Sequence, residues 1–561
     1  MEESENRIRN GRALTLLLLL SITAFVPRLL AMPNSLVNIS SPPMSEQNNS
    51  AFAWSEVAPP GQGYALWTEY PPAGFGTSTV MWSFTATAGA AWTGGSPLVV
   101  GAPFALTWNP AIASDINGYF FASSAGYGSV FPWTAIPNGI TFYFSTGLGA
   151  PFALGPVIAT NIPGATWLDY PNHVIDKYPG NPVVNVGTIH SAWVTFTGPF
   201  PDADGNGNGF DDPGDGFLIN YAYSRTTPGH APIYPAFSAS MVLFAGTVSV
   251  DALAAQRPSL AVMGPPGNIL VPPGGVYVAW TDGSLVYIDA SPALGAPFMG
   301  PVVISPISPI PPVISGGVHA CTNVTIGVGA GACAGRVYAA WTSTAGTSGT
   351  DIFFSSSPTG GAGTWSPAVR VNQDPFGTGL DQWAPKMVVD PTSGEICVSY
   401  YDRRNDAANV KVQTWVSVSK DCGMTWTDCQ VSDIPPIAPA STFGMLPAPR
   451  YMGDYLGADF NAVNGSGFIW NDSRAAATDQ NILFETAKGC TSACVGHCGD
   501  ANGDGLFNIS DAVFLIAYIF GGGPAPNPLC YGYANGDGTI NISDAVYLIA
   551  YIFGGGPAPH C

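Results

Sequence analysis

Alternating apolar and polar positions recur along the middle of the chain and predict short β-strands. A strand-like element that ends in small or hydroxyl residues occurs seven times, at intervals of roughly 60 to 80 residues. The copies are Val80–Ser83, Phe142–Ser145, Ile219–Ser224, Leu285–Ser291, Ile352–Ser355, Val412–Ser417 and Ile482–Thr486. This period predicts an all-β fold built from repeated units.

Other strands precede these copies. An alternating strand that closes on an aromatic residue comes before most of them, as at Val276–Trp280 and Val337–Trp341. A further strand led by proline comes before several of those, as at Arg257–Val262 and Ala384–Asp390. Three such strands and a fourth make a propeller blade. We therefore predict a seven-bladed β-propeller, with six blades as the alternative count.

The last copy has no fourth strand of its own before Lys488 and Cys490. An unpaired sheet edge must be covered. The segment Leu36–Ser40 resembles the fourth strands of other units, such as Ala368–Asn372. We expect it to pair with the final unit and close the ring.

The turn after the third strand of one unit reads Ser419-Lys-Asp421-Cys-Gly423-Met-Thr425-Trp426. Degenerate forms occur at Thr85–Trp92 and before Thr364-Trp365. This sequence resembles the Asp box of sialidase-like (BNR) propellers, and the resemblance covers most of residues 34–488 as a fold. In that family the box stabilises the turn and lies away from the catalytic site.

The resemblance raises the possibility of exo-sialidase activity, which needs three arginines that hold the substrate carboxylate. The arginines at Arg257, Arg403, Arg404 and Arg450 are the ones to examine. However, the family's Arg-Ile-Pro signature is missing, and no arginine occurs between residues 29 and 224. Arg403 and Arg474 follow blade aromatics in similar places, which indicates a repeated structural ion pair. We found no metal-type histidine spacing and no G-x-S-x-G elbow, and the sequence favours a protein that is not an enzyme.

A near-identical repeat ends the chain, where Ala501–Pro526 recurs as Ala534–Pro559 with 23 of 26 positions identical. Each copy begins with regularly spaced oxygen-bearing residues around a glycine, the pattern of a calcium loop. The predicted calcium ligands are Asp500, Asn502, Asp504, Leu506 (carbonyl), Asn508 and Asp511 in the first loop, and Asn535, Asp537, Thr539 (carbonyl), Asn541 and Asp544 in the second. Tyr533 replaces the first aspartate of the second loop, so the first loop should bind calcium more tightly.

The flanks of the apolar run after each loop predict a helix. In the first copy, Ser510-Asp511 offers an N-cap, Gly521 stands where a left-handed residue ends a helix, and Pro524 prevents continuation. The run is apolar on all sides, so the two helices should bury themselves against each other.

Two calcium loops that each lead into one helix resemble a dockerin domain. The resemblance implies a small α domain at residues 489–561, with calcium as its cofactor and a cohesin-like or cell-surface protein as its partner. Positions 10 and 11 of the loops are Ile509-Ser510 and Ile542-Ser543. The cohesin partner therefore rests on the family and not on these residues.

A second acidic segment runs from residue 202 to residue 212. Its candidate calcium ligands are Asp202, Asp204, Asn206, Asn208 and Asp211. It lacks the twelfth ligand of an EF-hand, so a calcium loop and a solvated Gly-rich turn are both open.

The N-terminus reads as a secretory signal at residues 1–31, because Arg7, Arg9 and Arg12 precede the apolar stretch Ala13–Val26. No later stretch has the length of a membrane span, so we expect a secreted protein, extracellular or at the cell surface. The ten cysteines all follow residue 320 and fit an oxidising compartment. We expect the local disulfides Cys321–Cys333 and Cys422–Cys429. Cys490, Cys494, His497 and Cys498 form either disulfides, which are favoured, or a zinc knuckle.

Composition limits the partners. Only 10% of the residues are charged and the formal net charge is −20, which argues against nucleic acid or an anionic membrane as a partner. The preferred interpretation is a non-catalytic propeller that binds a glycan or a protein and is tethered through the calcium-ordered tail. A self-assembling extracellular subunit, such as a sheath or filament protein, is the first alternative, and an exo-sialidase is the second.

Overall fold

The computed structural model describes most of the chain from Ser35 onward. The described residues are 35–37, 46–57, 59, 61–70, 78–128, 137–162, 166–178, 181, 187–197, 216–224, 237–247, 257–308, 310–311, 313–344, 349–432, 437–439, 450–461, 464–476, 479–486, 499–504, 506–524, 526, 529–532, 534–535 and 540–559. The predicted signal at residues 1–31 and the acidic segment with Asp202, Asp204, Asn206, Asn208 and Asp211 lie outside them.

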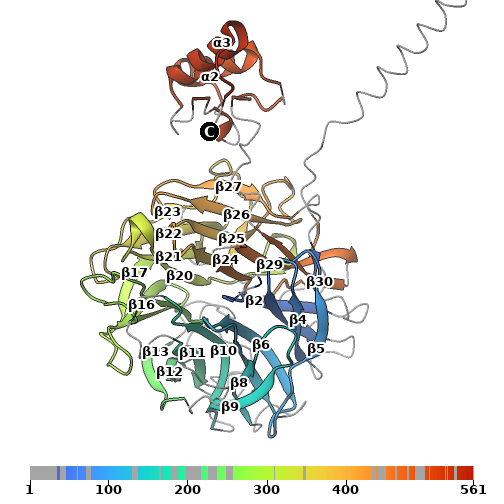
Figure 1. Cartoon of the computed structure of the whole chain (residues 1–561), viewed down its shortest axis with the longest axis vertical. Helices are drawn as coiled ribbons and strands as arrows, with labels where there is room; N and C mark the ends of the chain where they lie inside the picture. Colours follow the sequence, from blue (N-terminus) through green and yellow to red (C-terminus); the bar gives the residue numbers. More distant parts are fainter. Residues whose placement is uncertain are drawn as a thin grey trace, which may run out of the picture. The chain divides into compact units, whose positions relative to one another are not determined.

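Within these residues, antiparallel strands form seven sheets of four strands, which follow one another around a central axis (Figure 1). Blades 1 to 3 are β2–β5 (Glu46–Trp54, Gly63–Tyr70, Thr79–Thr85, Thr93–Pro97), β6–β9 (Leu106–Ser114, Phe120–Tyr127, Asn138–Ser145, Ala153–Thr160) and β10–β13 (Thr166–Ile175, Ile189–Thr197, Gly216–Ser224, Met241–Thr247). Blades 4 to 6 are β14–β17 (Ser259–Val262, Val276–Thr281, Leu285–Ser291, Val302–Pro306), β20–β23 (Val324–Val328, Val337–Ser343, Asp351–Ser357, Val369–Arg370) and β24–β27 (Gln382–Val389, Ile396–Asp402, Gln413–Ser419, Thr427–Gln430). Blade 7 is β28 (Gly457–Asn461), β29 (Gly465–Ala476), β30 (Asp479–Thr486) and β1 (Ser35–Leu36). The predicted seven-bladed propeller is confirmed.

The second strands show why these residues form blades. Every residue of β3, β7, β15, β21 and β25 is buried, because each blade packs between two neighbours. The tryptophans of the second strands are among the largest fully buried side chains of the described chain: Trp67, Trp280 and Trp341, with Trp193 of β11 and Trp470 of β29. Such indoles fill the space between the blades and supply much of the core.

The N-terminal strand closes the ring as predicted. Ser35 pairs with Phe484 and Leu36 with Leu483, and the backbone N–H of Val37 donates to the carbonyl of Ile482 at 2.8 Å. Val37 is completely buried, and its carbonyl accepts a hydrogen bond from the Ser83 hydroxyl at 3.0 Å. Blade 7 is therefore completed by residues from the opposite end of the propeller segment.

The Asp box forms the turn between β26 and β27. Asp421 accepts from the backbone N–H of Thr425 at 2.8 Å and from its hydroxyl at 2.6 Å, while the Ser419 hydroxyl accepts from the N–H of Gly423 at 2.9 Å. The degenerate Asp box after β4 makes the same hydrogen bonds to the backbone of the turn, with threonine hydroxyls in place of the aspartate and serine oxygens. There Thr87 accepts from the N–H of Ala91 at 2.8 Å, and Thr85 accepts from the N–H of Gly89 at 3.0 Å.

The predicted local disulfides are wrong. Cys333, in the 3-10 turn η4 (Gly331–Cys333) after β20, is bonded to Cys422 in the Asp box of blade 6, with their Cα atoms 5.7 Å apart. Cys429 is also disulfide-bonded, while Cys321 is a buried free thiol. The packing of adjacent blades brings together cysteines that are 89 residues apart, and spacing along the chain does not reveal this.

The C-terminal repeat forms two helices, α2 (Ile509–Gly521) and α3 (Ile542–Gly554), which pack against each other. Their buried residues are Ala512, Leu515, Ala545 and Leu548, together with Ala501 and Ala534. The predicted caps are displaced. Asn508 and Asn541 are the N-caps instead of Ser510-Asp511, because a side-chain amide oxygen two residues earlier accepts the free N–H group. The left-handed residue is Gly522, one position after Gly521.

The remaining elements are short. Strands β18 (Val313–Ile314) and β19 (Val318–His319) form a small hairpin around η3 (Ser315–Gly317), between blades 4 and 5, and η6 (Leu529–Gly532) lies between the two C-terminal helices. Among the described residues, none of the helices is both long enough and apolar enough to span a lipid bilayer.

Candidate functional site

The first strands of the blades contact one another around the axis, and four of them carry a bulge. Each bulge contains a residue with positive φ: Asn49 in β2, Asn109 in β6, Tyr170 in β10 and Ala384 in β24. Proline follows three of these residues, at Pro110, Pro171 and Pro385. A bulge inserts one residue and redirects the neighbouring side chains. The sequence analysis identified Pro385 as the leader of a strand but did not show that it marks a bulge.

Side chains from these bulges meet in a hydrogen-bonded chain, which we call the axial network. Asn49 Nδ2 donates to Asn109 Oδ1 at 2.5 Å, and Asn109 Nδ2 donates to Asp169 Oδ1 at 2.7 Å. The other oxygen of Asp169 accepts from Trp108 Nε1 and from the Tyr127 hydroxyl, both at 3.2 Å. Burial raises the pKa of Asp169 to about 6, although these hydrogen bonds oppose the shift.

The connection before blade 7 continues the axial network. Asn49 Oδ1 accepts from the Tyr451 hydroxyl at 3.2 Å and from the backbone N–H of Asp454 at 2.7 Å. The Tyr455 hydroxyl donates to the carbonyl of Pro110 at 2.9 Å. The guanidinium of Arg257 lies 3.1 Å from the centre of the Tyr455 ring, in a cation–π contact.

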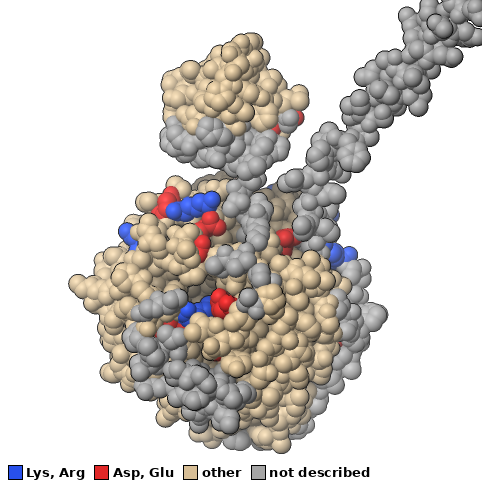
Figure 2. Space-filling model, in the orientation of Figure 1, with Lys and Arg blue, Asp and Glu red and all other residues tan. Residues whose placement is uncertain are grey.

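Arg257 also lines a cavity of about 700 Å³, the axial cavity, to which the first strands of all seven blades contribute. Its charged lining residues are Glu56, Lys177, Arg257, Lys386 and Asp459. Figure 2 shows positive and negative side chains together in a hollow at the centre of the propeller. This volume lies in the range of ordinary ligand sites.

The charges of the axial cavity fall into two groups. Lys177 Nζ lies 2.5 Å from Glu56 and 3.6 Å from Asp459, and although burial opposes it, these carboxylates raise the pKa of Lys177. Lys386 has no ion pair with another described residue. Burial and the neighbouring Arg257 lower the pKa of Lys386 to about 8, although the charge of Asp459 opposes the shift. In the first group two carboxylates surround one ammonium, so that group carries a formal charge of −1, whereas Arg257 and Lys386 lack a carboxylate within ion-pair distance among the described residues.

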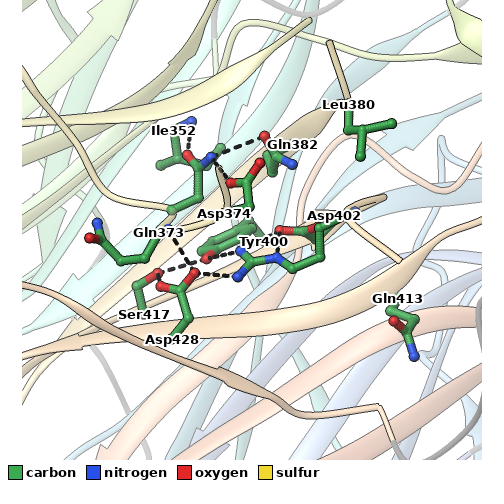
Figure 3. Close-up of polar contacts among 12 residues, drawn as sticks. Ile352, Gln373, Asp374, Leu380, Gln382, Tyr400, Asp402, Gln413, Ser417 and Asp428 are labelled. Atoms are coloured by element: carbon green, nitrogen blue, oxygen red, sulfur yellow. Dashed lines mark hydrogen bonds and ion pairs between the residues drawn. The ribbon is translucent and has the colours of Figure 1, made fainter. Parts of the chain in front are cut away.

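Two of the arginines singled out for a sialidase, Arg403 and Arg404, are held by different carboxylates. Arg404 contacts Asp402 at 2.6 Å and Asp428 at 2.5 Å, within the cluster whose Tyr400, Asp402, Ser417 and Asp428 point toward one another in Figure 3. Arg403 instead pairs with Asp381 at 3.1 Å and is fully buried.

The predicted repeated ion pair exists, shifted by one residue. Arg474 contacts Asp472 at 2.9 Å, and in both blades the arginine N–H and guanidinium bind an aspartate two residues earlier. The equivalent of Arg474 is therefore Arg404, not Arg403.

The first predicted calcium loop brings its carboxylates together. Asp511 lies close enough to Asp500 and Asp504 for their charges, with burial as the larger cause, to raise its pKa. Asp511 also accepts from the backbone N–H groups of Asn502 and Asn508 at 3.2 and 2.9 Å. Residues 499–559 contain five aspartates and no lysine, arginine or histidine. A cluster of hard oxygen donors without an internal cation fits calcium.

Two further observations bear on the loops. The Asn508 side chain accepts from the N–H of Ser510 at 2.8 Å, so the predicted ninth ligand serves as the helix cap. In the second loop, Asn541 and Asp544 repeat these contacts, and Asn535 N–H donates to Asp544 at 3.3 Å. Asp537 and Thr539 lie outside the described residues. All eleven residues of the two loops stay predicted ligands.

Comparison with protein families identifies the domain that contains the two predicted calcium loops. Residues 498–553 are a dockerin type I domain. The predicted dockerin resemblance is therefore confirmed, and dockerin type I domains bind calcium and cohesin partners. No curated protein matched the chain.

Solved structures similar to the propeller are distant. An α-L-arabinanase of Penicillium chrysogenum is 11% identical over 81% of this chain and 98% of its own, with a TM-score of 0.39. The NanB sialidase of Streptococcus pneumoniae is 10% identical over 75% and 82%, with a TM-score of 0.38. A PL25 ulvan lyase is 10% identical over 82% and 93%, with a TM-score of 0.42.

These similar structures are enzymes and contradict the prediction that the chain is not an enzyme. That prediction rested on the missing arginine triad, which tests one reaction only. At these identities, no substrate or reaction carries over from any of them to this chain.

Proposed function

We propose that the protein is an extracellular propeller that takes an acidic glycan into its axial cavity and is attached to a cohesin-bearing partner through its dockerin. We place the propeller at residues 34–488 and the tether at residues 489–561. The observation that carries the glycan assignment is the pair Arg257 and Lys386 in the cavity wall.

The charge balance supports an anionic ligand. The chain has a net charge of −20, yet two cations without carboxylate partners among the described residues face one cavity. A carboxylate or sulfate group on a sugar would satisfy both, because arginine and lysine hydrogen-bond such groups with charge assistance. Lys177 contributes less, since Glu56 and Asp459 already neutralise it.

The dockerin presents a paired surface for the tether. Val513 and Phe520 of α2 are 57% and 70% exposed, and Val546 and Phe553 of α3 have the same values. Ile509 and Ile516, with Ile542 and Ile549, complete an apolar stripe on each helix. Exposed apolar surface of this kind marks an interaction site. Because the two stripes have identical side chains, either one is suited to the same partner.

Calorimetric titration with a uronate-rich and a sulfated polysaccharide tests the glycan assignment, with a neutral arabinan as comparison. Lys386→Met removes the charge and keeps most of the stem, so it should weaken acidic-glycan binding about tenfold or more. Lys420→Met, an exposed lysine outside the cavity, is the matched control and should bind like the native chain. Equal binding of the neutral glycan, or no effect of Lys386→Met, would refute the proposal.

A second candidate function, catalysis on the bound glycan, is favoured by Lys386 itself. An amine with a pKa near 8 is a suitable general base near neutral pH. Beside a carboxylate held by Arg257, the neutral amine would take the proton from the adjacent carbon. The C–H electrons would form a double bond, the C–O bond to the next sugar would break, and its oxygen would take a proton from water.

The ultraviolet absorbance of the unsaturated product measures this elimination. The rate should rise with pH through about 8 and level off above it as Lys386 loses its proton, and Lys386→Met should abolish it. Binding of an acidic glycan without product at any pH would leave the binding function intact and exclude this reaction.

A further inference from the structure

Three potential metal ligands meet beside the axial network. His319 Nε2 lies 3.7 Å from Asp454 Oδ1, and Cys321 Sγ lies 3.7 Å from the same oxygen. The three ligand atoms all lie within 4.8 Å of one another, and each residue is more than nine-tenths buried. Among the described residues this is the one such group of histidine, cysteine and acidic side chains.

The backbone holds these residues in place from two different connections. His319 and Cys321 lie between blades 4 and 5, whereas Asp454 lies between blades 6 and 7. The two connections are joined where the N–H of His319 donates to the carbonyl of Arg450 at 2.8 Å and the N–H of Arg450 donates to Gly317 at 3.0 Å. Asp454 is fixed in turn by its N–H bond to Asn49. The ligands are therefore positioned by main-chain contacts that do not depend on a metal.

Asn323 supplies an independent observation. Its Nδ2 donates to the carbonyl of Asp454, and it lies beside the Cys321 thiol. Its Oδ1 is buried and has no hydrogen-bond partner among the described residues. An unsatisfied buried oxygen is costly, and a cation is one way to satisfy it.

The donor set selects the metal. Tetrahedral zinc with bond lengths of about 2.0–2.3 Å places its ligands roughly 3.3–3.8 Å apart, which fits both distances of 3.7 Å. One thiolate, one carboxylate and a neutral imidazole balance the charge of a divalent ion. A hard cation such as calcium would not choose the sulfur.

We propose that His319, Cys321 and Asp454 bind a zinc ion, with Asn323 at the edge of the site. The ion joins the connection between blades 4 and 5 to the connection between blades 6 and 7. It also binds the side chain of Asp454, whose backbone N–H donates to Asn49 of the axial network. This site is separate from the calcium loops of the dockerin and has different donor chemistry.

The test uses the full chain without an affinity tag, stripped with chelator and returned to calcium buffer. Cobalt(II) titration of the native chain should give intense visible bands of tetrahedral cobalt and a thiolate-to-cobalt charge-transfer band. Zinc added afterwards should abolish both. Mass spectrometry of the protein as purified should find about one zinc ion per chain.

Cys321→Ser should remove the charge-transfer band, while Cys397→Ser, which alters the other buried free thiol, should keep it. Asp454→Asn should weaken cobalt binding at least tenfold. Absence of the band in the native chain would overturn the proposal even if Cys321→Ser fails to fold. A band that persists in folded Cys321→Ser would also overturn it and would place the metal elsewhere, for example at Cys490–Cys498.

Discussion

Single residues in the Asp-box turns connect neighbouring blades. Gly423 has a φ of +87°, and a Cβ added there would come 2.1 Å from Phe354 of blade 5. Gly89 occupies the same place in blade 1, where an added Cβ would come 1.9 Å from Phe484 of blade 7. Trp426 and Trp92 of the same turns contact the same two phenylalanines. The glycine of the box thus has two functions: it permits the turn and it lets the turn pack on the preceding blade.

A comparison of Gly423→Ala with Gly363→Ala separates these two functions. We expect it to lower the free energy of unfolding by about 2–4 kcal/mol, since it adds both backbone strain and overpacking. Gly363→Ala is the control, because Gly363 also has a positive φ but no atom within 4 Å of the added Cβ. Calorimetric melting should show the larger loss for Gly423→Ala. Equal losses would show that the contact with Phe354 contributes nothing.

Asp169 should make the propeller less stable as the pH rises. Burial raises its pKa to about 6 in the folded state, above the ordinary value near 4. Between these values the folded chain binds the Asp169 proton more strongly than the unfolded chain does. The contribution of Asp169 to the free energy of unfolding is therefore present below pH 4 and lost above pH 6. We expect the fall in melting temperature between pH 4.5 and 7 to be smaller in Asp169→Asn. Asp421→Asn is the control, because the pKa of Asp421 is lowered and it titrates below this range.

At the level of elements, β1 contributes few residues but closes the ring. Val37 packs among Phe52, Trp54, Trp92 and Phe484 between blades 7 and 1. Leu36, its neighbour, is 43% exposed. The closure therefore depends on both the strand pairing and one buried side chain.

Val37→Asp should destabilise the propeller by about 2–5 kcal/mol, because it buries a charge without a partner. Leu36→Asp, one residue away, should cost less than about 1 kcal/mol. Removal of residues 35–40 should expose the edge of β30 and cause aggregation, measured by light scattering. A melting curve unchanged by Val37→Asp would contradict the closure.

The calcium loops of the dockerin should differ in affinity, because the first offers three carboxylates and the second two. Asp504→Ala should therefore weaken calcium binding more than Asp537→Ala in a calorimetric titration of the whole chain. Calcium binding should also be coupled to helix formation, so chelation should reduce the far-ultraviolet helix signal. Two sites of equal affinity would show that counting ligands is the wrong measure.

The sequence predicted those features of the fold that depend on residues close to one another along the chain. The third strands and the ring closure followed from alternation and from a missing strand, and the calcium loops followed from spacing. β7 was missed because Phe120–Tyr127 contains no β-branched residue and consists largely of small residues, unlike the equally buried strands β15 and β21. Three sets of contacts that join different blades were not predicted. They are the disulfide of Cys333, the hydrogen bonds among Asn49, Asn109 and Asp169, and the ion pairs of Lys177 with Glu56 and Asp459. Such contacts depend on the angle between blades, which no local pattern records.

For the whole molecule, the two identical stripes of the dockerin make a specific prediction about attachment. Phe520→Asp or Phe553→Asp alone should leave cohesin binding within about threefold, because the other stripe stays intact. The double variant should lose binding by at least about a hundredfold. Surface plasmon resonance in calcium buffer measures this, with Ile269→Asp on the propeller, 87% exposed, as the control. Loss of binding in one single variant would assign the partner to that helix alone.

The pairing of β1 with β30 also determines the order in which the propeller is completed. β1 is synthesised first and its partner last, roughly 450 residues later, which takes about 20–90 s at ordinary rates of translation. During that interval each of the first six blades acquires all its residues in turn, the sixth only when β27 has been made, and the two end faces of the incomplete ring stay exposed. The last strand made therefore converts an open arc into a ring in one step, and a nascent chain that stalls before Asp479 retains an unpaired edge for chaperones or proteases to bind.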